Sequence, residues 1–132
     1  MSVPPRVSLA TLGVTDVARA TEFYETLGWR LSPDSVPAIV SYLQTEGGRL
    51  SLVKTDDIST HAGITPRTST DFRGVLLTIN VDSAGAVDEA LRAAVQAGAA
   101  LVKAGERSDR GGYLGYFTDP DGHLWAVTHE PS

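Results

Sequence analysis

Two segments of the chain repeat the same order of hydrophobic and polar positions. The first, residues 7–31, is VSLATLGVTDVARATEFYETLGWRL, and the second, residues 74–102, is GVLLTINVDSAGAVDEALRAAVQAGAALV. In each segment a short β-prone run precedes apolar residues at helical spacing, and a glycine closes the stretch. The pattern predicts strands over Val7–Val14 and Gly74–Val81, each followed by an amphipathic helix.

Both predicted helices have residues that suit their ends. Asp16 stands at the N-cap of the first helix, and Asp82 or Ser83 stands at the N-cap of the second. Gly28 and Gly98 follow the last apolar positions and are typical C-terminal stops. The apolar stripes predicted to face the core are Val17, Ala20, Phe23, Tyr24 and Leu27 in the first helix and Val87, Leu91, Ala94 and Val95 in the second.

Each of the two segments is followed by a sequence that predicts a β-hairpin. Residues 42–53, YLQTEGGRLSLV, and residues 116–127, YFTDPDGHLWAV, each place a turn sequence between two β-prone runs. One more short strand is expected before each hairpin, near Trp29–Ser32 and Ala100–Lys103. The chain is therefore predicted to be α+β, with two tandem β-α-β-β-β modules in one domain. Module one covers about 5–54, a polar surface linker about 55–72, and module two about 73–130.

Alternation along the strands separates two faces. If Leu9 points to one face, Thr11 does too, while Leu12 and Val14 point to the other. The second module repeats this arrangement, with Leu76, Thr78 and Asn80 on one face and Leu77, Ile79 and Val81 on the other. One row is wholly apolar and is expected to pack under the helix. The other mixes apolar and small polar groups, which favours contact with water or a ligand, because a sheet covered on both faces is apolar on both.

Amino-acid composition and net charge exclude several classes of function. The chain has 132 residues, a net charge of −5 and no cysteine. The missing cysteines exclude disulfides, thiolate catalysis and cysteine-bound zinc. The negative charge argues against nucleic acid or an anionic membrane as a partner. Since the N-terminal residues show no secretory signal, we expect a cytoplasmic protein.

The paired modules, with VTDVARATEFYETLGW early and GYFTDPDGHLWAV late, resemble the vicinal oxygen chelate superfamily. This family holds glyoxalases, extradiol dioxygenases, fosfomycin-modifying enzymes and bleomycin-binding resistance proteins. The resemblance implies curved sheets that form a half-open barrel, with the helices on its convex face and a concave cup inside. The positions that hold one divalent ion in metalloenzyme members, usually through His, Gln or Glu, correspond here to Leu9, Leu76, Ala126 and Ser51, or Leu52 if the alignment shifts by one. Because none of these is a usual ligand, we expect no metal and no cofactor.

These observations predict a metal-free protein that binds a hydrophobic or aromatic small molecule in the concave cup. We expect Leu9 and Leu76 to approach each other there. Arg107 and Arg110 are further candidates, as a clamp for an acidic ligand at the rim. The residues predicted to line the cup are Leu9, Thr11, Tyr42, Gln44, Ser51, Leu76, Thr78, Asn80, Tyr113, Tyr116 and Ala126.

Two alternatives stay open. One is a glyoxalase- or dioxygenase-like metalloenzyme with displaced ligands. The other is a metal-free enzyme that uses a Tyr, Asp or His as acid-base catalyst. The histidines do not favour either, because His61 falls in the linker, His123 beside a turn, and His129 on the face away from Ala126. Unpaired sheet edges and the resemblance both lead us to expect a homodimer.

Overall fold

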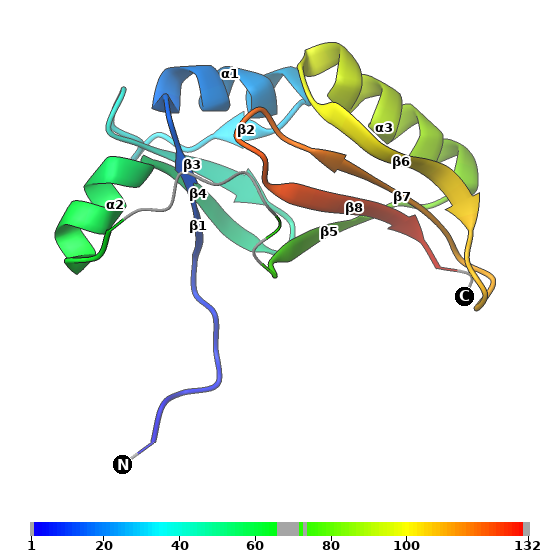
Figure 1. Cartoon of the computed structure of the whole chain (residues 1–132), viewed down its shortest axis with the longest axis horizontal. Coiled ribbons are helices and arrows are strands. Elements are labelled where there is room, and N and C mark those ends of the chain that lie inside the picture. Colours follow the sequence, from blue (N-terminus) through cyan, green and yellow to red (C-terminus); the bar gives the residue numbers. More distant parts are fainter. Residues whose placement is uncertain (1, 66–71, 73, 131–132) are drawn as a thin grey trace. The chain divides into compact units, whose positions relative to one another are not determined.

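The computed structural model describes residues 2–65, 72 and 74–130 of the chain. These residues form eight strands and three helices (Figure 1). The chain divides into two compact units, Met1–Arg67 and Thr68–Ser132. Each unit contains one β-α-β-β-β module, which confirms the predicted α+β class and the internal repeat.

The first unit contains one four-stranded mixed sheet in the order β1-β4-β3-β2. β1 pairs with β4 in parallel, and the other neighbours are antiparallel. The elements are β1 (Ala10–Val14), α1 (Val17–Thr26), β2 (Arg30–Leu31), β3 (Val40–Thr45), β4 (Gly48–Lys54) and α2 (Thr55–Ala62).

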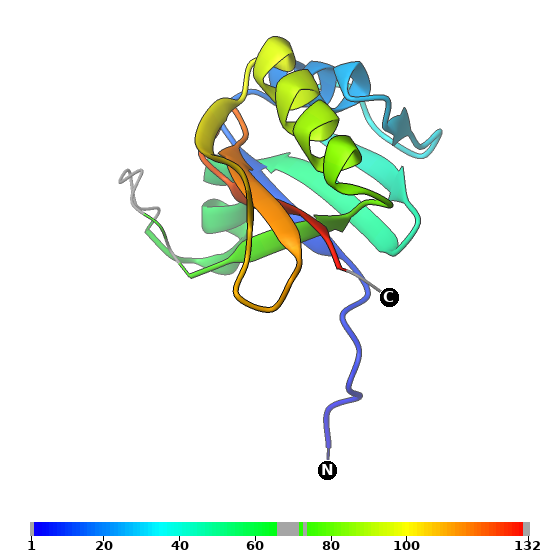
Figure 2. The same ribbon diagram turned by 90° about the vertical axis from the view of Figure 1, so that its right-hand side faces the viewer.

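The second unit repeats this topology with the order β5-β8-β7-β6, and again the pair formed by its first and last strands is parallel. Figure 2 shows α3 lying along one face of this sheet. The elements are β5 (Leu76–Asn80), α3 (Ala84–Ala97), β6 (Ala100–Arg107), β7 (Tyr113–Thr118) and β8 (Leu124–His129).

The helix ends follow the sequence signals. The Asp16 carboxylate accepts a hydrogen bond from the Arg19 N–H at 3.1 Å. Ser83, rather than Asp82, is the second N-cap, because its hydroxyl oxygen accepts from the Ala86 N–H at 3.0 Å. Gly98 ends α3 with a φ of +120°, a backbone conformation that residues with a Cβ rarely adopt.

Alternation builds the core of the first unit. Leu12 pairs with Leu52, and Leu43 with Leu50, so these side chains share one face of the sheet. They are at most 7 % exposed and pack with Val17, Phe23 and Tyr24 of α1. The apolar row of the first module therefore packs under its helix, as the sequence predicts.

The core of the second unit is built in the same way from α3 and two strands. Val87, Leu91 and Ala94 are the buried residues of the helix. On the sheet, Phe117 and Trp125 stack with ring centroids 6.2 Å apart, and both are buried. Trp125 pairs with Leu77 and Phe117, and it therefore lies on the helix-bearing face.

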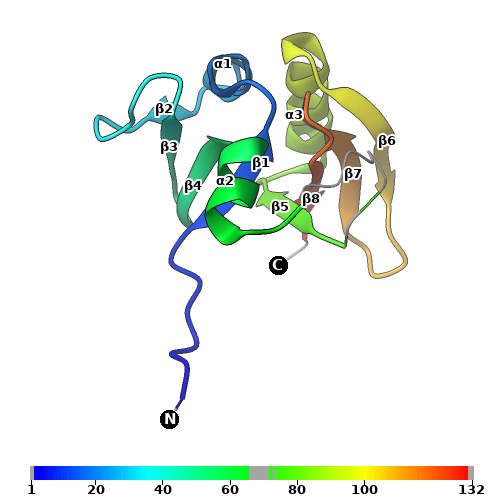
Figure 3. The ribbon, with the colours of Figure 1, turned by 60° about the vertical axis from the view of Figure 1, so that its left-hand side comes forward.

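Residues 55–62 of the predicted surface linker form the helix α2, in which Ser59 is the buried residue. Asp56 and Asp57 lie in its first turn, and Gly63 ends it in the left-handed conformation at φ +75°. Figure 3 shows α2 beside β1 and β4. A Cβ added at Gly13 would lie 2.7 Å from the Thr55 hydroxyl, so the glycine permits this close approach. Residues 66–71 of the predicted linker lie outside the described residues.

Among the described residues, none of the helices is both long and apolar enough to span a membrane.

Candidate functional site

Each sheet has a second face, turned away from its long helix, which we call the distal face. In the first sheet, Ser51 on β4 lies between Thr11 on β1 and Tyr42 on β3. In the second sheet, Ala126 on β8 lies between Thr78 on β5 and Tyr116 on β7. The distal residues used below are Thr11, Tyr42, Gln44, Arg49 and Ser51 in the first sheet and Leu76, Thr78, Asn80, Tyr116 and Ala126 in the second.

This register decides which residue of the first module corresponds to Ala126. Ser51 and Ala126 are each flanked by a threonine and a tyrosine in the same order. The alternative, Leu52, is wholly buried on the α1 face and pairs with Leu12. Ser51 is therefore the structural counterpart of Ala126.

A hydroxyl pair occupies the centre of the first distal face. The Thr11 Oγ1 and Ser51 Oγ atoms are 2.7 Å apart and share one hydrogen bond. Ser51 is 1 % exposed, whereas Thr11 stays exposed at the edge strand. This hydrogen bond stabilises the buried hydroxyl of Ser51, because without it the hydroxyl would have lost its contact with water and gained no partner in exchange.

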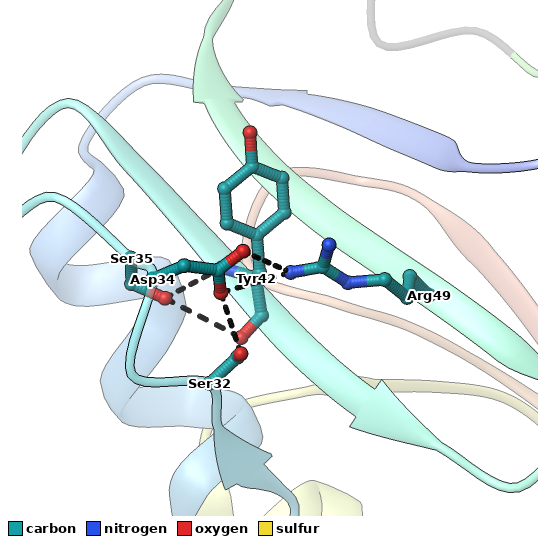
Figure 4. A network of polar contacts seen from close by, with 5 residues as sticks. All are labelled: Ser32, Asp34, Ser35, Tyr42 and Arg49. Atoms are coloured by element: carbon teal, nitrogen blue, oxygen red, sulfur yellow. Dashed lines mark hydrogen bonds and ion pairs between the residues drawn. The ribbon is translucent and has the colours of Figure 1, made fainter.

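An arginine that the sequence analysis did not single out, Arg49, lies on the same face two residues before Ser51, and Figure 4 shows it against Tyr42 and Asp34. The Arg49 guanidinium lies 4.3 Å from the centre of the Tyr42 ring, and its Nη2 atom lies 2.9 Å from the Asp34 carboxylate. The Ser32 hydroxyl also donates to Asp34, at 2.5 Å. The bond from Ser32 and the contact with Arg49 lower the pKa of the Asp34 carboxyl. Alternation from Ser51, two residues further along β4, was the signal that could have identified Arg49.

The second distal face also has a cation beside its tyrosine. Lys103 on β6 pairs with Tyr116 and lies 2.6 Å from the Glu106 carboxylate. The hydrogen bond with Glu106 raises the pKa of the Lys103 ammonium. Thr78 is exposed, whereas Ala126 is 3 % exposed. Ala126 is therefore a buried residue of this face.

Other predicted lining residues lie on or near the distal faces. Gln44 pairs with Arg49, and Leu76 pairs with Leu124 at the start of β5. Asn80 is exposed at the other end of β5. Leu9 lies just before β1 and is 41 % exposed, similar to Leu76 at 45 %. The expected approach of Leu9 and Leu76 stays a prediction.

The placement predicted for Tyr113 is wrong. Tyr113 pairs with His129, and its hydroxyl donates to the Asp88 carboxylate of α3 at 2.9 Å, so it lies on the helix-bearing face. The reason is parity, because Tyr113 and Tyr116 are three residues apart on one strand and must point to opposite faces. The bond to Asp88 raises the pKa of the Tyr113 hydroxyl. Arg107, proposed as a rim clamp, pairs with Tyr113 and is therefore placed with that face.

The residues at the family's metal positions do not fit a divalent ion. Leu9, Leu76 and Ala126 carry no donor atom, and the Ser51 hydroxyl is already bonded to Thr11. No group of three or more His, Asp or Glu side chains suitable for a metal occurs in the part of the chain that the structure describes. The buried Asp119 is instead held by the turn, where it contacts His123 Nδ1 at 2.8 Å and the Asp121 N–H at 3.0 Å.

An apolar groove lies on the helix-bearing side of the second unit, between α3 and β6. Its volume is about 480 Å³. The sequence analysis missed it because its walls come from the helix rim and a bulged edge strand, where alternation is interrupted. Its lining residues are Asp88, Leu91, Arg92, Val95, Gln96, Leu101, Ala104 and Gly105.

Solved structures with this fold come from several bacteria. A glyoxalase-related enzyme from Fulvimarina pelagi is 26 % identical, has a TM-score of 0.85, and the match covers 96 % of this chain and 89 % of that one. A glyoxalase/bleomycin resistance protein/dioxygenase family enzyme from Burkholderia phytofirmans is 21 % identical with a TM-score of 0.83, covering 92 % and 96 %. A lactoylglutathione lyase from Agrobacterium tumefaciens is 21 % identical with a TM-score of 0.71, covering 96 % and 95 %.

No curated protein matches the chain. The family model of the glyoxalase/bleomycin resistance protein/dioxygenase superfamily matches residues 6–127. This match covers nearly the whole chain and includes both modules. The repeat, the topology and the family model agree, and the chain belongs to the glyoxalase/bleomycin resistance protein/dioxygenase superfamily.

Proposed function

We propose that this protein binds a small hydrophobic or aromatic molecule on its distal sheet faces and does so without a metal. The observation that carries the proposal is the residue set at the family's metal positions, where Leu9, Leu76 and Ala126 offer no donor atom. A protein that keeps the fold but lacks the ion's ligands retains a surface for binding, not the family's metal chemistry.

The composition of the distal faces supports a ligand of this class. Tyr42 and Tyr116 supply flat apolar area with a polar end. Thr11, Thr78 and Asn80 add a few hydrogen-bonding groups among apolar neighbours. Small-molecule sites combine mostly apolar walls with a small number of polar groups that orient the ligand.

A thermal-shift screen of aromatic and hydrophobic compounds tests this function. A ligand that binds only the folded state raises Tm, by an amount that grows with its concentration over Kd. We expect at least one compound class to raise Tm, and Tyr116→Ala to reduce that shift. Tyr113→Ala is the matched control, because this tyrosine lies on the helix-bearing face. If the Tm shift is lost in Tyr113→Ala and kept in Tyr116→Ala, the ligand binds on the helix-bearing face and not on the distal face. If no compound in the library raises Tm, the proposed small-molecule binding is rejected.

Metal analysis separates this proposal from the metalloenzyme alternative. Because the family positions lack donors, elemental analysis of protein from metal-supplemented cells is expected to give far less than one ion per chain. A chelator is likewise expected to leave Tm unchanged. About one equivalent of zinc, iron, manganese or nickel would instead favour the alternative and point to ligands at other positions.

We also propose that the protein is a cytoplasmic homodimer. β6 is the edge of the second sheet, and Leu101 and Val102 on it are 51 % and 56 % exposed. Such edges are commonly paired or covered. Light scattering at micromolar concentration is expected to give twice the chain mass of 14.0 kDa, and a value equal to the chain mass would contradict the dimer.

A further inference from the structure

Arg49 is a cationic residue of the first distal face, which Arg30 shares, and the Arg49 side chain is held in place from two sides. The Tyr42 ring lies 4.3 Å from the guanidinium carbon, and Asp34 accepts from Nη2 at 2.9 Å and 3.0 Å (Figure 4). A guanidinium stacked on an aromatic ring loses little further freedom when it binds a planar acceptor. Arg49 is thus pre-oriented on the distal face, two residues before Ser51 on β4.

The guanidinium keeps unused donors in this position. Both contacts with Asp34 use Nη2, and the N–H groups on Nε and Nη1 have no partner among the described residues. Arg49 has 44 % of its side chain exposed, so an incoming molecule can reach these donors. A ligand carboxylate can accept from one of these N–H groups, and it forms a planar bidentate pair with the guanidinium when it takes the place of Asp34 at Nη2.

We propose that Arg49 selects ligands that carry a carboxylate, with Tyr42 holding the guanidinium and Asp34 competing for it. This inference rests on the proposed function, since it names the chemical class of the ligand on the distal face. Asp34 lies outside the regular strands, in the segment between β2 and β3, and is 57 % exposed. An exposed ion pair is weak enough for a ligand carboxylate to share or replace it.

The neighbouring Ser32 and Ser35 stabilise this arrangement without the ligand. Ser32 donates to Asp34 at 2.5 Å, and the Ser35 hydroxyl accepts from the Tyr42 N–H at 2.9 Å. Asp34 therefore keeps a partner when its contact with Arg49 is exchanged. If Asp34 competes with the ligand, removing Arg49 should weaken the binding of acids and removing Asp34 should strengthen it. A purely structural role for the ion pair does not predict these opposite effects.

The test uses a panel of aromatic carboxylates, each paired with its neutral primary amide, and measures Kd by calorimetry. For the unchanged chain we expect each acid to bind about tenfold more tightly than its amide, as for one charge-assisted hydrogen bond. Arg49→Gln should remove this preference by weakening acid binding about tenfold more than amide binding. Arg49→Lys, which keeps the charge but not the planar donor pair, should retain only part of it.

Asp34→Asn supplies the discriminating result. Removing the competing carboxylate should strengthen acid binding and so raise the ratio of acid to amide affinity. If Asp34→Asn weakens acids and amides equally, the ion pair only holds the segment in place, and the inference is overturned. It is also overturned if acids and amides bind alike, although the proposed function then stands. If no member of the panel binds, carboxylate selection is rejected, whereas the proposed function fails only when the whole screening library gives no Tm shift.

Discussion

The two units place the same kinds of residue in the same register, yet their distal centres differ in chemistry. Thr11, Ser51 and Tyr42 form a row in which the serine and threonine hydroxyls bond at 2.7 Å. In the second unit the corresponding central residue is Ala126, which has no side-chain polar atom. The central residue is a serine in one unit and an alanine in the other, and both units have the same topology. The fold therefore does not depend on which of the two is present.

The helix-bearing faces differ in how the helix approaches the sheet. Ser41 precedes Tyr42, and its hydroxyl lies 2.6 Å from that of Thr21 on α1. Gly115 precedes Tyr116 at the corresponding place, and a Cβ there would lie 2.5 Å from Leu91 Cδ1 of α3. One unit joins helix to sheet through a buried hydroxyl pair, and the other through close packing against a glycine. The comparison predicts that changes on the helix-bearing faces cost stability, whereas changes on the distal faces alter binding.

The largest loss of stability is expected from Trp125→Ala. Trp125 is 5 % exposed and stacks on Phe117, so its truncation should lower the free energy of unfolding by about 3–5 kcal/mol. Urea unfolding measures this loss. The matched control is the next residue, Ala126. Ala126→Ser reproduces the serine of the first distal row, and Thr78 can form a hydrogen bond with the new hydroxyl, as Thr11 does with Ser51. A larger loss for Ala126→Ser than for Trp125→Ala would invert the assignment of the two faces.

Gly115→Ala should have the next largest effect, a loss of about 1–3 kcal/mol, as overpacked cores show. The new methyl group would meet Leu91 Cδ1 at 2.5 Å and the rigid carbonyl oxygen of Lys103 at 2.8 Å. The measurement is again urea unfolding, with Gly47→Ala as a control, since a Cβ at Gly47 meets no atom within 4 Å. Equal stability of the two variants would show that α3 does not depend on this close approach.

Ser41→Ala should cost less, about 1 kcal/mol, because it removes one buried hydrogen bond. Thr21 would not be left unpaired, since its hydroxyl also donates to the Val17 carbonyl oxygen at 2.6 Å. Combining Ser41→Ala with Thr21→Val gives a double-mutant cycle for the pair. Additive losses in that cycle would mean that the bond between the two hydroxyls does not stabilise the first unit.

The smallest effect is expected from Tyr113→Phe, and it should depend on pH. Asp88 accepts from the Tyr113 hydroxyl and raises its pKa above the ordinary value of 10.0. A raised pKa in the folded state stabilises the protein fully below the ordinary value, and the contribution is lost as the pH rises through the raised pKa. The difference in Tm between the unchanged chain and Tyr113→Phe should therefore shrink in strongly alkaline buffer. A difference that grows there would contradict the hydrogen bond.

Periodicity was enough to predict most of this fold. Alternation placed Leu12 and Val14 on the helix-bearing face, and cap chemistry located the start of α1 at Asp16. These features are local, so each can be derived from a few neighbouring residues. The helix α2 was missed because its eight residues are mostly polar and only Ser59 is buried, which leaves no clear apolar stripe.

The distal site was less predictable because its register is set by pairing between distant strands. Ser51 was the expected counterpart of Ala126, with Leu52 as the alternative, and only the pairing of β4 with β1 and β3 decides between them. Tyr113 was misplaced because proximity to Tyr116 in sequence was taken for proximity on one face. Arg49 was overlooked because its contacts with Tyr42 and Asp34 depend on a segment whose path no periodicity specifies.

The central claim, that the distal faces bind the ligand, is tested most directly by mapping the best compound from the screen onto side-chain methyl resonances. Methyl groups report the two faces of a strand separately, because neighbouring residues point to opposite sides. The account predicts ligand-induced shifts at the distal methyls of Thr11, Leu76 and Thr78, with Leu12, Leu52 and Val127 on the helix-bearing faces unchanged. Shifts confined to Leu91, Val95 and Leu101, which line the groove between α3 and β6, would contradict it.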